Sequence, residues 1–376
     1  MKNIMIPRET REAETRVAAT PQTVSTLVNF GCRVWVQAGA GCHSGFSDRD
    51  YQSLGAEIVG EELEVYRSIH LILQVKRPAD DLERAILANL PPHAAILGVL
   101  DPQAPCNDHV FEYQSRQLTT FTWEWLPQSD RTKSFDAIAL MSRISGKIVV
   151  DEFMRNASIS NLTNRRVLVI GLGNAGLAAV KQAIQYGGHV TGIATNSRFQ
   201  SFLESWNCQL VQIPKDDLTA QQSRIRSVLL DSKCPFDLVV CAARRRGQLA
   251  PLLITAETLN QLKQLTVFYD LTASSGGNCE GNQFGKTVQI GHAVISNTTG
   301  YPKLHPQLST PPYADCVLKF VTHLLGFNSQ ATSTIDDCLQ SCLTTSGLIA
   351  PRLAEGSNPQ QFFTQCKQWY EQFIKL

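Results

Sequence analysis

The stretch RRVLVIGLGNAGLAAVKQAIQYGG, from Arg165 to Gly188, places an apolar strand, a glycine-rich turn and an alanine-rich helix in direct succession. A dinucleotide-binding βαβ unit has this order. Its first glycine allows a tight turn, its second lets the backbone approach a pyrophosphate, and its third permits close helix packing. The unpaired N–H groups at the start of the helix then face the phosphates. The residues predicted to bind the cofactor here are Gly171, Gly173, Asn174, Ala175 and Gly176.

A second strand, His189 to Ala194, follows this helix and ends without an acidic residue. Dinucleotide sites for NAD usually carry an Asp or Glu at this point, roughly 20 residues beyond the glycines, to bind the ribose 2′-hydroxyl. Here Ser197 and Arg198 could bind a 2′-phosphate, which would favour NADP. Alternatively, Thr195 or Asn196 bonds the ribose hydroxyl of NAD, and Arg198 is a solvated surface charge. The sequence therefore leaves NAD and NADP open as cofactors.

Composition indicates an ordinary globular protein. The 376 residues include 43% apolar and 18% charged residues with a net charge of +1, which fits two domains and gives no sign of a nucleic-acid surface. No apolar run reaches the roughly 18 residues of a membrane span, and the N-terminus lacks a hydrophobic signal region, so a cytoplasmic location is expected. Cys338 and Cys342 lie four apart with no histidine nearby. We therefore expect no metal site.

Strands alternate with helices on both sides of the glycine motif, which predicts largely parallel sheets. A long helix is predicted from 134 to 156 and another from 313 to 325. The predicted fold is α/β, with two Rossmann-like domains joined by long helices and a cleft between them. The N-terminal domain takes residues 1–133, completed by returning C-terminal helices at about 309–376. The NAD(P)-binding domain takes residues 134–308.

Three ordered motifs carry a family resemblance. They are ETRVAATP from Glu14 to Pro21, GLGNAG from Gly171 to Gly176, and DLTASSGGNCE from Asp270 to Glu280. Together they resemble the alanine dehydrogenase and NAD(P) transhydrogenase alpha-subunit family, above all the soluble nucleotide-binding domain of the transhydrogenase alpha subunit. The resemblance implies a nucleotide on the second domain, a homodimer, and cofactor contacts from the late loop through Ser274, Gly276 and Asn278.

The alanine dehydrogenase branch is matched in part. In that branch an arginine and a lysine hold the substrate, and these align with Arg16 and Lys76. Such a pair suits an oxo acid, because a guanidinium clamps a carboxylate and an ammonium polarises a carbonyl. Asp101 stands where the branch has its catalytic histidine, and Ser274 where it has an aspartate. Asp101 is either a substitute proton carrier or a turn residue before Pro102.

The transhydrogenase branch is also matched in part. Its loop before the interdomain helix, which contacts the nicotinamide and the partner domain, aligns with residues 128–139. Arg131 and Asp136 match this loop, whereas Lys133 replaces a glutamine and Ala139 a serine.

The resemblance implies an oxidoreductase that transfers hydride to or from bound NAD(P)(H), with a second nicotinamide nucleotide on a partner protein. An amino-acid or 2-oxo-acid dehydrogenase with a small-molecule substrate is the alternative. A catalytically silent nucleotide-binding regulator is a third possibility.

Overall fold

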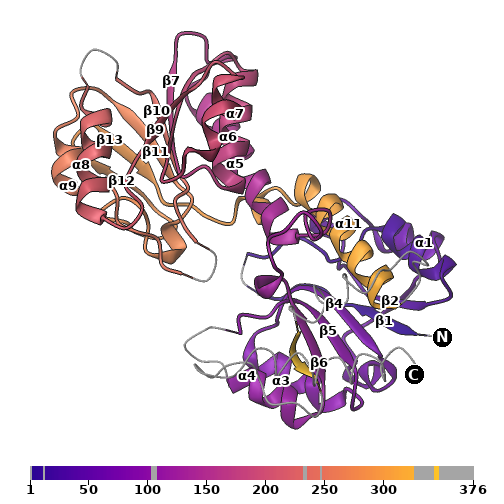
Figure 1. Cartoon of the computed structure of the whole chain (residues 1–376). Helices are drawn as coiled ribbons and strands as arrows, with labels where there is room; N and C mark the ends of the chain where they lie inside the picture. The colour runs from indigo at the N-terminus through magenta and orange to yellow at the C-terminus, as the bar shows by residue number, and fades with distance from the viewer. Residues whose placement is uncertain are drawn as a thin grey trace. The chain divides into compact units, whose positions relative to one another are not determined.

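The computed structural model describes residues 2–11, 13–102, 108–231, 235–245, 248–325 and 343–346. By contacts the chain divides into two compact units (Figure 1). The first unit is Met1–Ile138 with Pro302–Leu376, and the second is Ala139–Tyr301. The predicted helices beyond 325, together with Cys338 and Cys342, lie outside the described residues.

The first unit is built on a seven-stranded sheet of order β14-β6-β5-β4-β1-β2-β3. All neighbours are parallel except β14, which is antiparallel to β6. The chain adds β2 and β3 on one side of β1 and then β4, β5 and β6 on the other, so the strand order reverses between β1 and β4. The strands are β1 (Asn3–Ile6), β2 (Arg33–Gln37), β3 (Glu57–Val59), β4 (Leu71–Lys76), β5 (Ala95–Val99), β6 (Thr119–Thr122) and β14 (Leu343–Ser346).

Helices cover both faces of this sheet, with α1 and α11 on one face and α3 and α4 on the other (Figure 1). Helix α1 begins where the sequence predicts it, since Thr20 Oγ1 accepts the backbone N–H of Thr23 at 3.2 Å. The α-helices are α1 (Pro21–Asn29), α2 (Asp48–Ser53), α3 (Asp80–Asn89), α4 (Asp108–Ser115), α10 (Tyr301–Leu304) and α11 (Pro306–Leu324). Three 3-10 turns accompany them, η1 (Cys42–Ser44), η2 (Leu63–Ser68) and η3 (Trp123–Trp125).

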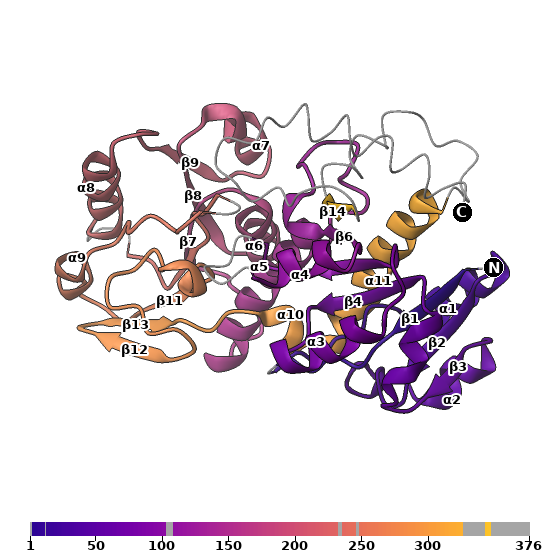
Figure 2. The same ribbon diagram turned by 90° about the horizontal axis from the view of Figure 1, so that it is seen from below.

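The second unit has its own seven-stranded sheet, of order β12-β13-β11-β10-β7-β8-β9. It is parallel except for β12, which pairs antiparallel with β13 at one edge (Figure 2). The strand order reverses here between β7 and β10. The strands are β7 (Arg166–Ile170), β8 (His189–Ala194), β9 (Gln209–Gln212), β10 (Leu238–Cys241), β11 (Thr266–Asp270), β12 (Thr287–Ile290) and β13 (Ala293–Ser296).

Two hydrophobic cores lie on opposite faces of the second sheet. One packs α5 and α6 against it, and the other packs α8 and α9 (Figure 1). The helices are α5 (Ala137–Asn156), α6 (Asn174–Gln185), α7 (Gln200–Glu204), α8 (Leu218–Leu229) and α9 (Ala256–Asn260), with the 3-10 turns η4 (Ser197–Phe199) and η5 (Ala273–Ser275). Within the described residues, no helix is both long and apolar enough to cross a membrane.

The α/β class with two Rossmann-like, mainly parallel sheets is confirmed, and two helix starts are corrected. Helix α5 begins at Ala137 rather than at 134, because the chain closes a turn first, with Phe135 N donating to Thr132 O at 2.9 Å. Helix α11 begins at Pro306 rather than 313, because Pro306 occupies the first helical turn, where its missing N–H costs nothing.

Candidate functional site

The glycine turn between β7 and α6 has a separate reason for each glycine. Gly171 has φ +91°, and a Cβ there would lie 2.7 Å from the backbone of Ala243. A Cβ on Gly176 would lie 1.9 Å from the carbonyl oxygen of Gly171, so helix and turn could not pack as they do. A Cβ on Gly173, by contrast, would meet nothing within 4 Å. Gly171 and Gly176 therefore build the turn, and Gly173 keeps the space above it open.

That open space belongs to a cavity of about 540 Å³ at the carboxyl ends of β7, β8 and β10. This is the point where the strand order reverses, and ligands of open α/β sheets bind at such points. The predicted cofactor residues that line the cavity are Gly171, Gly173, Thr195, Asn196 and Arg198. The remaining predicted residues of the turn, Asn174, Ala175 and Gly176, form the first turn of α6, and Ser197 begins η4.

The late loop, Asp270 to Glu280, is held by a buried carboxylate. Asp270 is fully buried and accepts the backbone N–H groups of Thr272, Asn278 and Cys279 at 2.9, 2.6 and 3.1 Å. Asn278, also fully buried, bonds both backbone polar groups of Ala243 at 3.0 Å. The Asn278 amide thus anchors the loop that follows β10. Ser274 and Gly276 are exposed on the turn between them.

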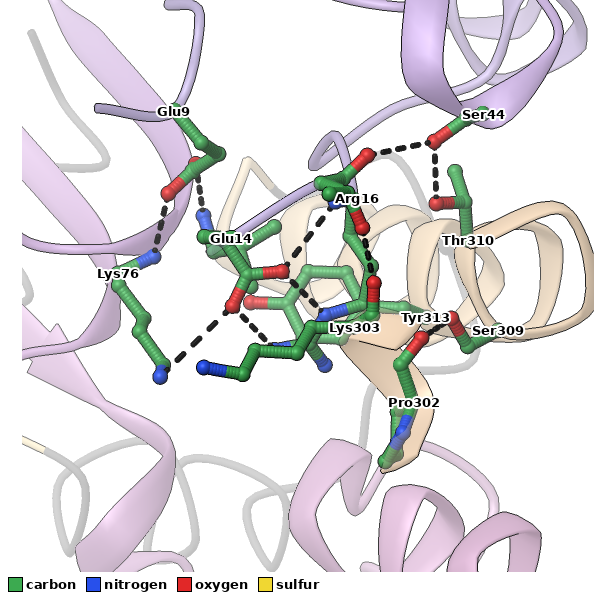
Figure 3. A network of polar contacts seen from close by, with 12 residues as sticks. Glu9, Glu14, Arg16, Ser44, Lys76, Pro302, Lys303, Ser309, Thr310 and Tyr313 are labelled. Carbon is green, nitrogen blue, oxygen red and sulfur yellow. Dashed lines mark hydrogen bonds and ion pairs between the residues drawn. The ribbon is translucent and has the colours of Figure 1, made fainter. Parts of the chain in front are cut away.

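The first unit contains a charged cluster of Glu9, Glu14, Arg16 and Lys76 at the carboxyl ends of β1 and β4, where its own strand order reverses (Figure 3). Arg16 is 8% exposed and forms a bidentate pair with Glu14, from Nε and Nη2 at 2.7 Å each. Lys76 Nζ lies 3.7 Å from Oε2 of the same carboxylate, the oxygen that accepts from Arg16 Nη2. The structure therefore brings the two predicted substrate residues, Arg16 and Lys76, together around Glu14.

Electrostatics keep Glu14 ionised inside this cluster. Burial alone would raise the pKa of Glu14, but the hydrogen bonds and charge of Arg16, helped by the charge of Lys76, hold it below its usual value. The ring of Tyr313, on α11, lies under the guanidinium with 5.6 Å between Arg16 Cζ and the ring centroid. Tyr313 itself is fixed because its hydroxyl donates to Gln74 O at 3.1 Å and accepts from Trp123 Nε1 at 2.9 Å.

Glu9 is the member of the cluster that the sequence does not predict. Its carboxylate accepts the backbone N–H groups of Val75 and Lys76 at 2.6 and 3.0 Å, which fixes the end of β4 that carries Lys76. Burial raises the pKa of Glu9 to about 8, although the two N–H groups oppose this rise. Glu9 is therefore mostly protonated at neutral pH. No spacing in the sequence marks it, because its partners lie 66 and 67 residues away.

Asp101 follows β5, the strand that pairs with β4, and Lys76 ends β4. The backbone of Asp101 has φ +49°. A left-handed backbone of this kind is typical of a turn residue. Its backbone N–H and that of Leu100 donate to Glu124 Oε2 at 3.3 and 3.0 Å. Burial and the charge of Asp101 raise the pKa of Glu124 to about 7. Glu124, after β6, is a second acidic group at this sheet edge.

The remaining candidates differ in their surroundings. Arg131 is exposed, whereas Asp136 is 3% exposed and directly precedes α5. Asn297, which follows β13, was not predicted. It is fully buried, and neither its amide nitrogen nor its amide oxygen has a partner among the described residues. A buried amide without partners marks a place where a polar ligand group or water can bind. The described residues include no group of three or more His, Cys, Asp or Glu suited to a metal ion.

The two sheets, with a glycine turn and a cavity at the switch point of the second, define a protein of the two-domain dinucleotide-binding class. Residues 5–145 match the family model described as "Alanine dehydrogenase/PNT, N-terminal domain", and residues 137–349 match "Alanine dehydrogenase/PNT, C-terminal domain". The chain therefore belongs to the alanine dehydrogenase/PNT family, which confirms the resemblance predicted from the motifs.

Individual relatives come from both branches. The NAD(P) transhydrogenase subunit alpha of Haemophilus influenzae is 28% identical over 82% of this chain, which spans 64% of that protein. The alanine dehydrogenase of Bacillus subtilis is 26% identical, covering 74% of this chain and 72% of its own. The solved transhydrogenase from Sinorhizobium meliloti shares the fold, with a TM-score of 0.79 at 23% identity, covering 93% of this chain and 98% of that one. Transhydrogenases and dehydrogenases are oxidoreductases, so the class predicted from the sequence is confirmed for the family.

Proposed function

We propose that this chain binds a nicotinamide nucleotide, NAD(P)(H), in the cavity beside Gly173 and transfers hydride to or from it, as the soluble part of a transhydrogenase alpha subunit would. The cavity itself carries this proposal. Its volume of about 540 Å³ lies in the usual range for cofactor sites. It stands at a strand-order switch point and opens beside the N-terminus of α6, a helix of 12 residues.

Different residues of this chain would bind the pyrophosphate and the nicotinamide of the nucleotide. The N–H groups of Asn174, Ala175 and Gly176 at the start of α6 would bind the pyrophosphate, because the helix dipole favours negative charge there. Gly173 would let the backbone come close to it. The nucleotide would donate or accept the hydride, and the exposed turn with Ser274 and Gly276 would position the nicotinamide.

The second nicotinamide nucleotide would come from a partner protein, since the Haemophilus relative is by name one subunit of a larger enzyme. Arg131 and Asp136 would act at the loop that meets this partner. We also propose a homodimer in the cytoplasm.

The charged cluster favours a second candidate, an amino-acid or 2-oxo-acid dehydrogenase. Arg16 and Lys76 contribute two positive charges and Glu14 one negative charge, while Glu9 is mostly neutral because burial raises its pKa to about 8. The cluster therefore keeps a net positive charge, and the Lys76 side chain is 34% exposed. A substrate carboxylate could bind there, with Lys76 polarising its oxo group and Asp101 or Glu124 carrying the proton.

Oxidation of NADH and NADPH by the purified protein tests both candidates, against 2-oxo acids with ammonia and separately against a nicotinamide-analogue acceptor. Turnover with an oxo acid that is lost in Arg16→Ala and Lys76→Ala would establish the dehydrogenase. Exchange with the analogue alone, retained in both variants, would support the transhydrogenase reading. If the protein binds nucleotide but shows no turnover under any condition, including with added partner protein, it would be a catalytically silent nucleotide-binding regulator.

A further inference from the structure

The nucleotide cavity has a strongly basic lining at the ends of β8, β9 and β10. Among the described residues, four cationic side chains line it, and a single carboxylate, Asp216, accompanies them. The cations are Arg198, Lys215, Arg244 and Arg245. A site for NAD places a carboxylate at the end of the second strand, which would repel a 2′-phosphate. Here Ala194 ends that strand, and Thr195 follows it.

Arg198 and Lys215 come to the same rim from neighbouring strands. Strand β8 pairs with β9 so that Ala194 lies opposite Gln212, and Ile213 N donates to Ala194 O at 3.0 Å. Arg198 follows the end of β8 by four residues, and Lys215 follows the end of β9 by three. Both side chains are exposed and line the cavity. Neither forms an ion pair with any carboxylate in the described part of the chain.

Local contacts hold Arg198 at this rim. Asn196 Oδ1 accepts the backbone N–H of Arg198 at 2.7 Å and so begins the η4 turn. The guanidinium of Arg198 stacks on the ring of Phe199, with 4.6 Å between Cζ and the ring centroid.

We propose that Arg198 and Lys215 form a subsite for the 2′-phosphate of NADP(H), and that this chain uses NADP(H) in preference to NAD(H). A phosphate monoester carries close to two negative charges at neutral pH, and a guanidinium beside an ammonium provides charge-assisted bonds to it. The inference rests on the proposed function, since it specifies which nucleotide fills the same cavity.

Dissociation constants of NADPH and NADH for the full chain, from nucleotide fluorescence, test the proposal directly. We expect NADPH to bind at least about tenfold more tightly, the effect of one hydrogen bond to a charged group. Arg198→Ala and Lys215→Ala should each raise the dissociation constant of NADPH about tenfold. Each should change the dissociation constant of NADH by less than about twofold. Lys263→Ala is the matched control, an exposed lysine of the same unit that does not line the cavity, and it should change neither constant.

Two further measurements separate the subsite from general attraction of anions. Thr195→Asp places a carboxylate after β8. It should weaken the binding of NADPH at least about tenfold more than it weakens the binding of NADH. Competition by 2′,5′-ADP should be lost in Arg198→Ala, whereas competition by 5′-AMP should remain. Equal or tighter NADH binding in the unaltered chain would overturn the proposal while leaving the proposed function intact, as would equal losses of both nucleotides in the variants. Failure of both nucleotides to bind would overturn the proposed function and this inference with it.

Discussion

At the scale of single residues, Glu14 determines whether two cations can remain in the charged cluster. Its side chain is fully buried and neutralises Arg16, whose side chain is 9% exposed. Removing one partner of a buried pair leaves an uncompensated charge, which typically costs about 3–5 kcal/mol. We therefore expect Glu14→Gln to lower the free energy of unfolding by about that amount, measured by urea denaturation.

The control is Glu61→Gln, because Glu61 pairs with Arg8 at the surface, where its side chain is 73% exposed. An exposed pair contributes little, so this variant should unfold at the same urea concentration as the unaltered chain. Similar losses in the two variants would show that the burial of the Arg16 pair has no energetic consequence.

Glu9 gives a pH dependence with a defined sign. Burial raises its folded pKa from 4.5 to about 8, so the folded chain binds this proton more tightly than the unfolded chain does. The resulting stability is complete below pH 4.5, falls as the pH rises, and is lost above about 8. Glu9→Gln cannot titrate, so between pH 5 and 9 the unaltered chain should lose more stability than the variant, by a few kcal/mol at about 1.4 kcal/mol per pKa unit.

Urea unfolding of both proteins at intervals of one pH unit measures this difference. The loss of one acceptor oxygen in the glutamine adds a constant offset, which does not affect the slope. Parallel curves for the two proteins would mean that Glu9 titrates normally in the folded chain.

At the scale of elements, two glycines of the turn, three positions apart, have different roles: Gly176 allows packing and Gly173 allows binding. Gly176→Ala places a methyl group 1.9 Å from the carbonyl oxygen of Gly171 and should cost more than about 2 kcal/mol of stability, as overpacking does. Gly173→Ala meets open space at an extended φ of −80°. It should leave the melting temperature unchanged but weaken nucleotide binding at least about tenfold, because the methyl group stands where the pyrophosphate would pass.

Melting curves and nucleotide titrations of both variants decide the point. Unaltered nucleotide affinity in a well-folded Gly173→Ala protein would place the nucleotide away from the turn.

The elements also show which parts of the fold can be predicted from sequence. The βαβ unit is predictable because its apolar strand, glycine turn and helix follow one another directly in the chain, whereas the contact of Gly171 with Ala243 involves a distant segment. Strand β12 is not, because its residues alternate between exposed and half-buried positions and form no buried run. The start of α11 is hidden by Pro311 and Pro312, which read as helix breakers although they lie inside the helix.

The candidate site divides in the same way. Arg16 and Lys76 are predicted as substrate residues through the family resemblance, and the structure brings them together. Glu9 and Asn297 cannot be found from spacing, because their environments depend on segments distant in the chain. Asn278 is predicted as a cofactor residue from its motif, and the contacts of its amide with the loop after β10 are not visible in the sequence.

At the scale of the whole molecule, each unit has a sheet with its own switch point and a polar site at that point. The charged cluster lies at the reversal between β1 and β4, and the nucleotide cavity at the reversal between β7 and β10. The polar sites thus follow from topology, because a reversal of strand order leaves a crevice at the carboxyl ends that no crossover helix covers.

This arrangement predicts that the second unit folds and binds its nucleotide alone. Among the described residues, its two cores draw only on positions from 144 to 301, and the cavity is lined only by positions from 170 to 253. A fragment of residues 139–301 should therefore unfold cooperatively and bind NADPH within about threefold of the full chain's affinity, since a domain with its own core can fold alone. Circular dichroism and nucleotide titration measure both properties. A folded fragment that fails to bind NADPH would show that the first unit contributes to the nucleotide site. An unfolded fragment would show that the stability of the second unit depends on the first unit.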